Sequence, residues 1–369
     1  MSRTAGQRTK LRKGGRSRGL GRVTLADVAR AAGVHSTTVS AVLNQRDHCY
    51  ASAETRQRIV AAAERLGYRP SALARGLSGQ RTATIGMVTT GYDVELVTRM
   101  MFGVESMASR AGLFVLSAAT YNDAELEDQV IQQLIDRGVD GIVIWPCMSG
   151  EHRELRRLAE RGFPIVTFGH AGRLNFPTDA VYDDAAEAGR LQAQHLIACG
   201  CERIWLITFS ERCDVNDRKI AGFEQAMAEA GRDVRQFVVE DPKFSWYAHD
   251  RSEFEQLRDL FRDHADELDA LACPGDMVAQ VAVRIATEMG LRVPDDVAII
   301  GNGGMSGSAD GALPLSTIGF DAEGVGRTAF ELLEEQLDGK RGQDDPCRTI
   351  VIQPELIPRA STVGYRQRA

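Results

Sequence analysis

Two successive sets of short apolar segments alternate with amphipathic segments, and this pattern limits the fold more than any other feature. The first set contains apolar runs at 85–88, 113–116, 141–144 and 164–168. The second begins with a helical pattern at 185–198 and contains apolar runs at 204–207, 237–239, 270–272 and 297–300. Strands that are apolar on both faces are typical of parallel sheets covered by helices. We therefore expect two similar α/β lobes, with a ligand cleft at the carboxyl ends of their strands.

The length and composition are those of a multidomain globular chain. At 369 residues, 43% hydrophobic and 26% charged, the chain exceeds one ordinary core. No apolar run reaches the roughly 18 residues that a membrane span needs, and the basic N-terminus has no hydrophobic stretch behind it. We expect a cytoplasmic protein without a membrane partner.

Charge is divided unevenly along the chain. Residues 1–81 carry 16 lysines and arginines against 4 acids, a net charge of +12, which leaves 28 against 47, or −19, for residues 82–369. Eight basic residues and no acid fall within residues 1–22, diluted by glycine and serine. A basic head on an acidic body is typical of a nucleic-acid binder with a separate regulatory domain.

Three short helices are predicted after the basic arm. Thr24 and Asp27 have the spacing of a capping box, and Gly33 ends the helix that they begin. A second helix follows at 36–44 after a tight turn, and Ser52 caps a third that ends at Gly67. Two short helices joined by a glycine turn indicate a helix-turn-helix.

The outward face of the second helix is small and polar. Short hydroxyl side chains let a helix lie deep in the major groove and bond phosphates or base edges, and Ala41 can contact a thymine methyl. A surface helix with no groove to enter would more usually carry glutamate and lysine. The outward or capping positions are His35, Ser36, Thr37, Thr38, Ser40 and Ala41.

The following segment, 68–79, has a proline that can open a short helix at Pro70. About eight residues are too few for a stable isolated helix, so we expect it to order only against a partner or DNA.

Here the sequence resembles the LacI/GalR family of regulators. The shared motifs run from Val23 to Val34 and continue at 38–40, 42–44, 67–70 and 74–77; further matches include 139–142, 195–200, 221–223, 290–301 and 315–318. The resemblance implies an all-α helix-turn-helix headpiece joined to an α/β periplasmic-binding-protein-like sensor domain. It also implies a homodimer that binds a palindromic double-stranded DNA operator and responds to a small-molecule effector, most simply as a repressor.

The pattern and the resemblance together assign a set of DNA contacts. Ser36, Thr37 and Ala41 would occupy base-reading positions, and Leu77 would wedge into the central base step from paired hinge helices. A linker-core role for Leu77 remains the alternative. His35 stands where the family usually has serine, and the loop 44–52 is about two residues longer than in well-known members. The full predicted set is Thr24, His35, Ser36, Thr37, Thr38, Ser40, Ala41, Asn44, Tyr68, Ser71, Ala74 and Leu77.

We expect five segments: a basic arm at 1–21, a DNA-binding domain at 22–67, a hinge helix at 68–81, a two-lobed effector-binding and dimerisation domain at 82–360, and a tail at 361–369.

The effector positions depart from those of sugar-binding relatives, which hold vicinal hydroxyls with carboxylates, amides and arginine. Matching positions here carry Tyr121, Trp145, Gly169, Lys219, Gly275 and Gly303, while Asp276 is retained. We expect an effector that is not a simple sugar. The alternative is a degenerate, ligand-free sensor, which would make the chain a DNA-localised binding or partner-recruiting module. The predicted effector contacts are Thr90, Tyr121, Trp145, His170, Lys219, Trp246 and Asp276.

No feature indicates catalysis or a cofactor. There is no phosphate-binding loop, nucleophile elbow or metal-ligand spacing, so the chain is not expected to be an enzyme. The seven cysteines are scattered and odd in number, which argues against a disulfide framework or a zinc site. Cys199 and Cys201 are close enough for metal or redox chemistry, but reduced buried thiols are commoner.

Overall fold

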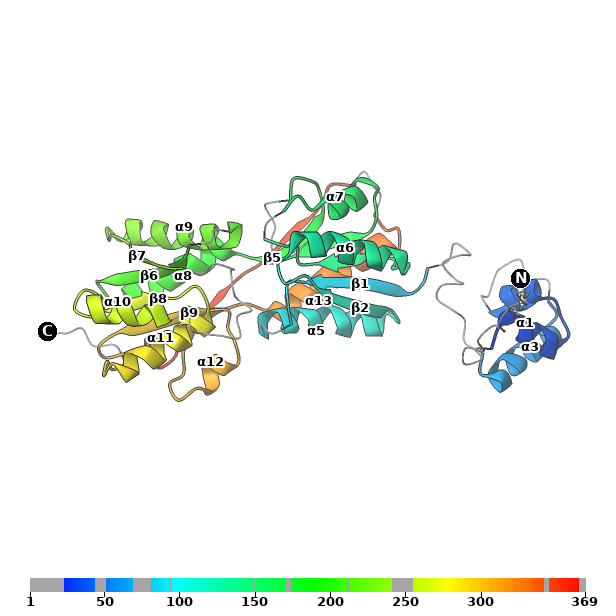
Figure 1. Cartoon of the computed structure of the whole chain (residues 1–369), viewed down its shortest axis with the longest axis horizontal. Helices are drawn as coiled ribbons and strands as arrows, with labels where there is room; N and C mark the ends of the chain where they lie inside the picture. Colours follow the sequence, from blue (N-terminus) through cyan, green and yellow to red (C-terminus); the bar gives the residue numbers. More distant parts are fainter. Residues whose placement is uncertain are drawn as a thin grey trace, which may run out of the picture. The chain divides into compact units, whose positions relative to one another are not determined.

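The computed structural model describes residues 23–43, 51–68, 81–92, 95–148, 150–169, 174–210, 213–240, 255–341 and 345–364. It divides into two units, Met1–Gln80 and Arg81–Ala369, and each is treated by itself below (Figure 1).

The first unit contains three helices around one small core. They are α1 (Leu25–Ala32), α2 (Ser36–Leu43) and α3 (Ala53–Leu66). Each helix contributes one fully buried β-branched side chain, Val28, Val39 and Ile59. The predicted helix-turn-helix and the third helix are therefore confirmed.

Their ends follow the predicted capping signals. The Asp27 N–H donates to Thr24 Oγ1 at 3.3 Å, and the Thr24 N–H donates to Asp27 Oδ2 at 2.9 Å, which completes the capping box. Gly33 and Gly67 end α1 and α3 with φ of +67° and +64°, a left-handed conformation that glycine adopts without strain.

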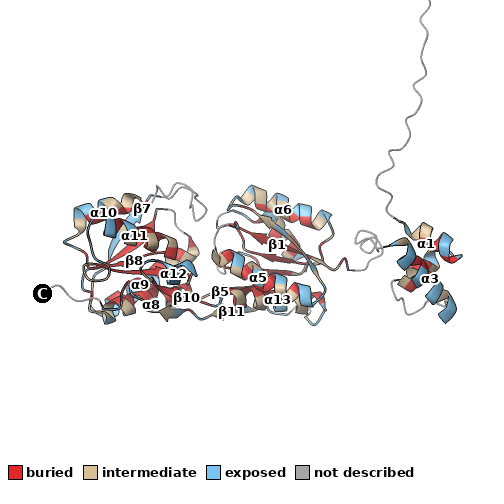
Figure 2. Cartoon of the chain, turned by 90° about the horizontal axis from the view of Figure 1, so that it is seen from below, coloured by how far each residue is buried: buried red, intermediate tan, exposed pale blue. Residues whose placement is uncertain are grey.

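The second unit has two lobes, each a six-stranded sheet between helices (Figures 1 and 2). The first lobe's strands are all parallel, in the order β11-β5-β4-β3-β1-β2. Helices α5 (Glu95–Arg110) and α13 (Ala322–Leu337) pack on one face, and α6 (Ala124–Asp136) and α7 (Arg153–Glu160) on the other. The strands are β1 (Thr84–Thr89), β2 (Phe114–Ala119), β3 (Ile142–Ile144), β4 (Ile165–Phe168), β5 (Asp179–Asp183) and β11 (Thr349–Ile352).

The second lobe has the order β12-β10-β9-β8-β6-β7, with only β12 antiparallel. Helices α8 (Ala185–Ala198) and α9 (Asp214–Glu229) cover one face; α10 (Leu257–His264) and α11 (Asp276–Glu288) cover the other. A short helix, α12 (Gly307–Asp310), follows β9. The strands are β6 (Ile204–Phe209), β7 (Arg235–Val239), β8 (Ala270–Ala272), β9 (Ala298–Asn302), β10 (Ser316–Gly319) and β12 (Glu355–Ile357).

Glycines allow one helix pair in each lobe to pack backbone against backbone. A Cβ atom on Gly189 of α8 would lie 1.9 Å from the Lys219 carbonyl oxygen of α9. In the first lobe, a Cβ atom on Gly326 of α13 would lie 1.9 Å from the Met100 carbonyl oxygen of α5. Any larger residue would push these helices apart.

The chain passes between the lobes three times, after β5, after β10 and after β11. The two predicted sets of strands do form the two lobes, but the prediction was incomplete. It did not include β5, β10, α13, β11 or β12, so it missed the return of the chain to the first lobe. Within the described residues, no helix is both long and apolar enough to cross a membrane.

Candidate DNA-reading surface and effector cleft

The outward face of α2 is built on a fixed inner face. Val39 and Val42 are buried against α1 and α3, so the opposite face of the helix is turned away from the core. Thr37 is exposed, while Ser36 and Ala41 are half-buried. The predicted base-reading residues therefore share one small, accessible surface, and their DNA contacts stay predictions.

His35 caps α2. Its Nδ1 accepts from the Thr37 backbone N–H at 3.4 Å and lies 2.9 Å from the Thr37 hydroxyl. With Nδ1 as the acceptor, the neutral ring carries its proton on Nε2. The exposed imidazole can thus donate to a DNA phosphate while it caps the helix.

Other predicted DNA contacts are less informative. Thr24 is exposed but its hydroxyl serves the capping box, and the Tyr68 N–H donates to the Ala63 carbonyl at 2.8 Å at the end of α3. Asn44, Ser71, Ala74 and Leu77 lie outside the described residues, as do the predicted effector contacts His170 and Trp246.

Trp145 and Gly169 lie in contact directly after β3 and β4 of the first lobe. A Cβ atom on Gly169 would lie 2.7 Å from the Trp145 indole, and Gly169 has a φ of +82°. The indole also meets Phe168 edge-on, with ring centroids 5.8 Å apart. An aromatic ring therefore fills the space that a side chain at position 169 would need.

Two further predicted residues on this lobe differ in exposure. Thr90 is fully buried at the end of β1. Tyr121 follows β2 with 63% of its surface exposed and a φ of +50°. Their contacts with an effector stay predictions.

The second lobe has a small pocket around the buried Lys219 of α9, lined by both polar and apolar side chains. The Lys219 ammonium donates to the Pro274 carbonyl at 3.0 Å and to Asn302 Oδ1 at 3.3 Å. Burial lowers the pKa of Lys219, and the nearby Asp183 carboxylate opposes that shift. Asn216, one turn earlier on α9, lines the same pocket and has no hydrogen-bond partner for its buried Nδ2 among the described residues.

The Asp276 carboxylate is hydrogen-bonded to residues of its own lobe. Its carboxylate accepts from Thr317 Oγ1 at 2.5 Å, and from the Met305 N–H and Ser308 Oγ at 2.8 Å each. Burial raises the pKa of this carboxyl, while these hydrogen bonds oppose the shift. Asp276 thus anchors the loop after β9, and a contact with the effector stays a prediction.

Comparisons with known proteins agree with this architecture. Residues 24–71 match the family described as bacterial regulatory proteins, lacI family, and residues 193–362 match a periplasmic binding protein-like domain. The HTH-type transcriptional repressor PurR of Mannheimia succiniciproducens is 31% identical over 341 residues, covering 92% of this chain and 98% of that protein. The chain belongs to the LacI family of bacterial regulatory proteins.

Other LacI-family members show the same relationship. The PurR repressor of Haemophilus influenzae is 32% identical over 340 residues, with 92% of this chain and 98% of that protein covered. The lac repressor dimer bound to operator and the anti-inducer ONPF has a TM-score of 0.78 at 23% identity, covering 93% and 100% of the two chains. The similarity to the lac repressor concerns the fold alone. As a LacI-family member, the chain is a DNA-binding transcription regulator with a helix-turn-helix head and a sensor domain.

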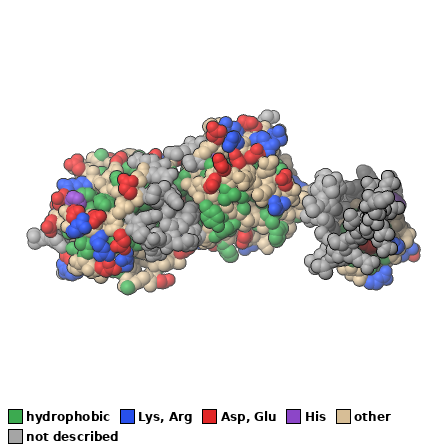
Figure 3. Space-filling model, viewed as in Figure 1, with side chains coloured by type: hydrophobic (Ala, Val, Ile, Leu, Met, Phe, Trp, Pro, Cys, Tyr) green, Lys and Arg blue, Asp and Glu red, His purple; other side chains and the backbone are tan. Residues whose placement is uncertain are grey.

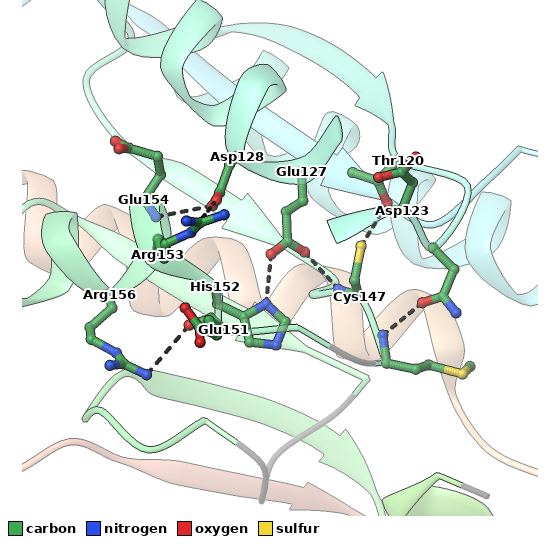
Figure 4. Close-up of polar contacts among 12 residues, drawn as sticks. Thr120, Asp123, Glu127, Asp128, Cys147, Glu151, His152, Arg153, Glu154 and Arg156 are labelled. Carbon is green, nitrogen blue, oxygen red and sulfur yellow. Dashed lines mark hydrogen bonds and ion pairs between the residues drawn. The ribbon is translucent and has the colours of Figure 1, made fainter. Parts of the chain in front are cut away.

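Sequence reasoning missed a polar cluster beside the cleft, formed by Glu127, His152 and the backbone of Cys147 (Figure 4). One signal was available: Glu127 shares a helical face with the buried Ile131 and Leu134, where an acid is out of place unless it has partners. Asn216 had no comparable signal, because a polar residue one turn before Lys219 is ordinary on a half-buried helix.

Proposed function

We propose that this regulator is a repressor that binds a near-palindromic operator as a dimer. The single observation behind this proposal is the small, polar outward face of α2, fixed by the buried Val39 and Val42. Each copy supplies one such helix, so two-fold symmetry gives two mirrored half-sites. The names of the PurR relatives support repression. A DNA-bound role places the protein in the cytoplasm and gives it no need of catalysis.

We further propose that the effector is not a simple sugar. A polyol taken out of water needs many polar partners, whereas the positions directly after β3 and β4 carry Trp145 and Gly169 in contact with each other. The effector acts by favouring one arrangement of the lobes, because a ligand shifts an equilibrium only through its different affinities for the two states.

Selection of the full chain against a random duplex library tests the repressor proposal. The expected product is a palindromic motif, and substitution of Thr37 by alanine should relax the preference at one position in each half-site. A selection that yields no symmetric motif would refute the proposal.

A thermal-shift screen against sugars, nucleosides and phosphorylated metabolites tests the effector proposal. Stabilisation by one non-sugar class is expected. Stabilisation by a monosaccharide alone would overturn the proposal, and operator binding indifferent to every metabolite would favour the ligand-free alternative.

A further inference from the structure

A buried carboxylate and a histidine form a pair beside the cleft of the second unit. Glu127 on α6 is fully buried, and its Oε1 lies 2.6 Å from His152 Nδ1. Its Oε2 accepts from the Cys147 N–H at 2.6 Å (Figure 4). Both carboxylate oxygens are therefore occupied, and the imidazole is fixed in place.

This arrangement determines which ring nitrogen of His152 can accept a hydrogen bond from a ligand. A carboxylate that accepts at Nδ1 keeps the proton there, so the neutral ring offers a lone pair at Nε2. The side chain is only 7% exposed, and Nε2 has no hydrogen bond to any described residue. His152 lines a pocket between the two lobes, so its Nε2 is available to a donor group of a molecule bound there.

The loops around the pair are held in uncommon conformations. His152 has φ +48° and ψ +49°, and Asn122 has a φ of +61°. Asn122 Oδ1 also accepts from the Met148 N–H at 2.6 Å, which ties the loop after β2 to the loop after β3. Left-handed conformations of non-glycine residues are typical of binding sites, where the surrounding contacts outweigh their strain.

The pocket that His152 lines is mainly apolar and rich in sulfur. Cys147, Met148 and Leu174 line it from the first lobe, and Cys213 and Asp214 from the second. The Asp214 carboxylate already pairs with Arg218 at 3.0 Å. This wall suits a ligand with an apolar body and few polar groups.

We infer that His152 is a specificity-determining residue for the effector, and that its Nε2 accepts a hydrogen bond from an N–H or O–H group of a small, mainly apolar molecule. Glu127 is a positioning residue that holds the imidazole tautomer. The inference rests on the proposed role of the cleft as the effector site.

The test uses three probes on the full chain: phenol, which has a flat apolar body and one O–H donor; anisole, which has the same ring without the donor; and D-glucose, a polyol. Binding is measured by saturation-transfer NMR. Phenol should bind in the millimolar range and more tightly than anisole or glucose.

His152→Asn is the matched variant. The asparagine amide can replace Nδ1 as the donor to Glu127, asparagine tolerates the left-handed backbone better than most residues, and Nε2 is removed. Phenol binding should weaken about 3- to 10-fold, the value of one hydrogen bond, while anisole binding stays unchanged. An unchanged melting temperature verifies the fold of the variant.

Glu127→Gln tests the positioning role. NMR of ¹⁵N-labelled histidine should show His152 protonated at Nδ1 in the native chain and a larger Nε2-protonated fraction in the variant. A purely structural role for Glu127 would leave the tautomer unchanged.

Equal binding of phenol and anisole, no phenol binding at 10 mM, or native phenol affinity in His152→Asn would each overturn the inference. These outcomes are independent of operator selection. Failure to select a symmetric operator would refute the repressor proposal and leave the phenol series intact.

Discussion

His35 is suited to two tasks at the start of α2, and a serine could perform only one of them. Its Nδ1 caps α2 through the Thr37 N–H, and its Nε2 is left to donate outward. Capping contributes to the stability of α2, whereas an outward N–H contributes to the affinity for phosphate. Substitution can separate the two.

His35→Ser should retain the cap and lose the phosphate contact. Operator affinity and non-specific affinity should fall together, about 3- to 10-fold per half-site, because a phosphate contact carries no sequence information. His35→Ala should additionally loosen α2, because loss of an N-cap costs about 1 kcal/mol.

Titration of operator and random duplexes at fixed salt measures the affinity, and hydrogen exchange of the α2 amides measures the cap. Selective loss of operator binding in His35→Ser would show that the imidazole reads bases instead.

The sequence predicted the chemistry of single residues well only where the partner was close in the chain. Thr24 and Asp27 lie three residues apart, and their capping box was predictable. The contact between Trp145 and Gly169 joins residues from two loops, so each looked like a separate loss of polarity. The structure shows that the Trp145 indole occupies the space that a side chain at position 169 would need.

At the scale of elements, Asp179 at the start of β5 connects three parts of the first lobe. Its carboxylate accepts from the Arg348 N–H at 2.7 Å beside β11 and from Gln336 Nε2 at 2.9 Å on α13, and it also pairs with Arg341. Burial would raise the pKa of Asp179, but these hydrogen bonds outweigh the effect of burial and lower the pKa below its ordinary value.

Asp179→Asn should destabilise the second unit by about 3–5 kcal/mol, because it removes the buried carboxylate that Arg341, Gln336 and the Arg348 N–H all bind. Thermal unfolding should show a melting temperature lower by about 5–15 °C. Asp338→Asn is the control, since Asp338 pairs with Arg81 and Lys340 at the surface and should shift the melting temperature little.

The same carboxylate predicts a pH dependence. A folded-state pKa below the unfolded value stabilises the protein above pH 3.8, and this contribution is lost as the pH falls through the folded-state value. The stability difference between the native chain and Asp179→Asn should therefore be constant near neutrality and narrow below about pH 4. A difference that persists undiminished at pH 2 would contradict this assignment.

Elements with a regular apolar pattern were predictable, and those defined by distant pairing were not. The continuous apolar runs at 85–88, 204–207 and 297–300 were recognised, and they form most of β1, β6 and β9. Strand β5 begins and ends with aspartate, and β11 is four residues long, so neither stands out locally. Their strand character depends on pairing with each other across more than 160 residues of chain.

At the scale of the whole molecule, exposed aromatic side chains gather on the first lobe near α5 and the edge strand β2. Phe102 on α5 is 59% exposed and Phe114 on β2 is 65% exposed. Figure 3 shows hydrophobic side chains over this part of the lobe. An apolar surface beside an edge strand is typical of an association site, and we expect the second copy of the proposed dimer to cover it.

Phe102→Glu combined with Phe114→Glu should convert the proposed dimer to a monomer in sedimentation experiments. Operator affinity should fall sharply, because two half-sites are then no longer bound by one particle. Val363→Glu, at a site that is 56% exposed in the second lobe, is the control and should remain dimeric. A dimeric double variant would exclude this surface.

Substitution of Leu77 tests whether the predicted hinge helix bends DNA. Leu77→Ala should weaken operator binding much more than non-specific binding, because only the specific complex gains from the wedge. Competitive titration with operator and unrelated duplexes measures both affinities, and equal losses would favour the linker-core role.

The three passages between the lobes also affect how the protein is made. Strand β11 completes the first lobe's sheet and β12 the second's, and the two are only two residues apart. A ribosome must therefore translate residues 349–357 before either sheet has all its strands. The N-terminal DNA-binding unit can fold long before that, so a translation product interrupted near residue 340 would carry a reading head without a finished sensor.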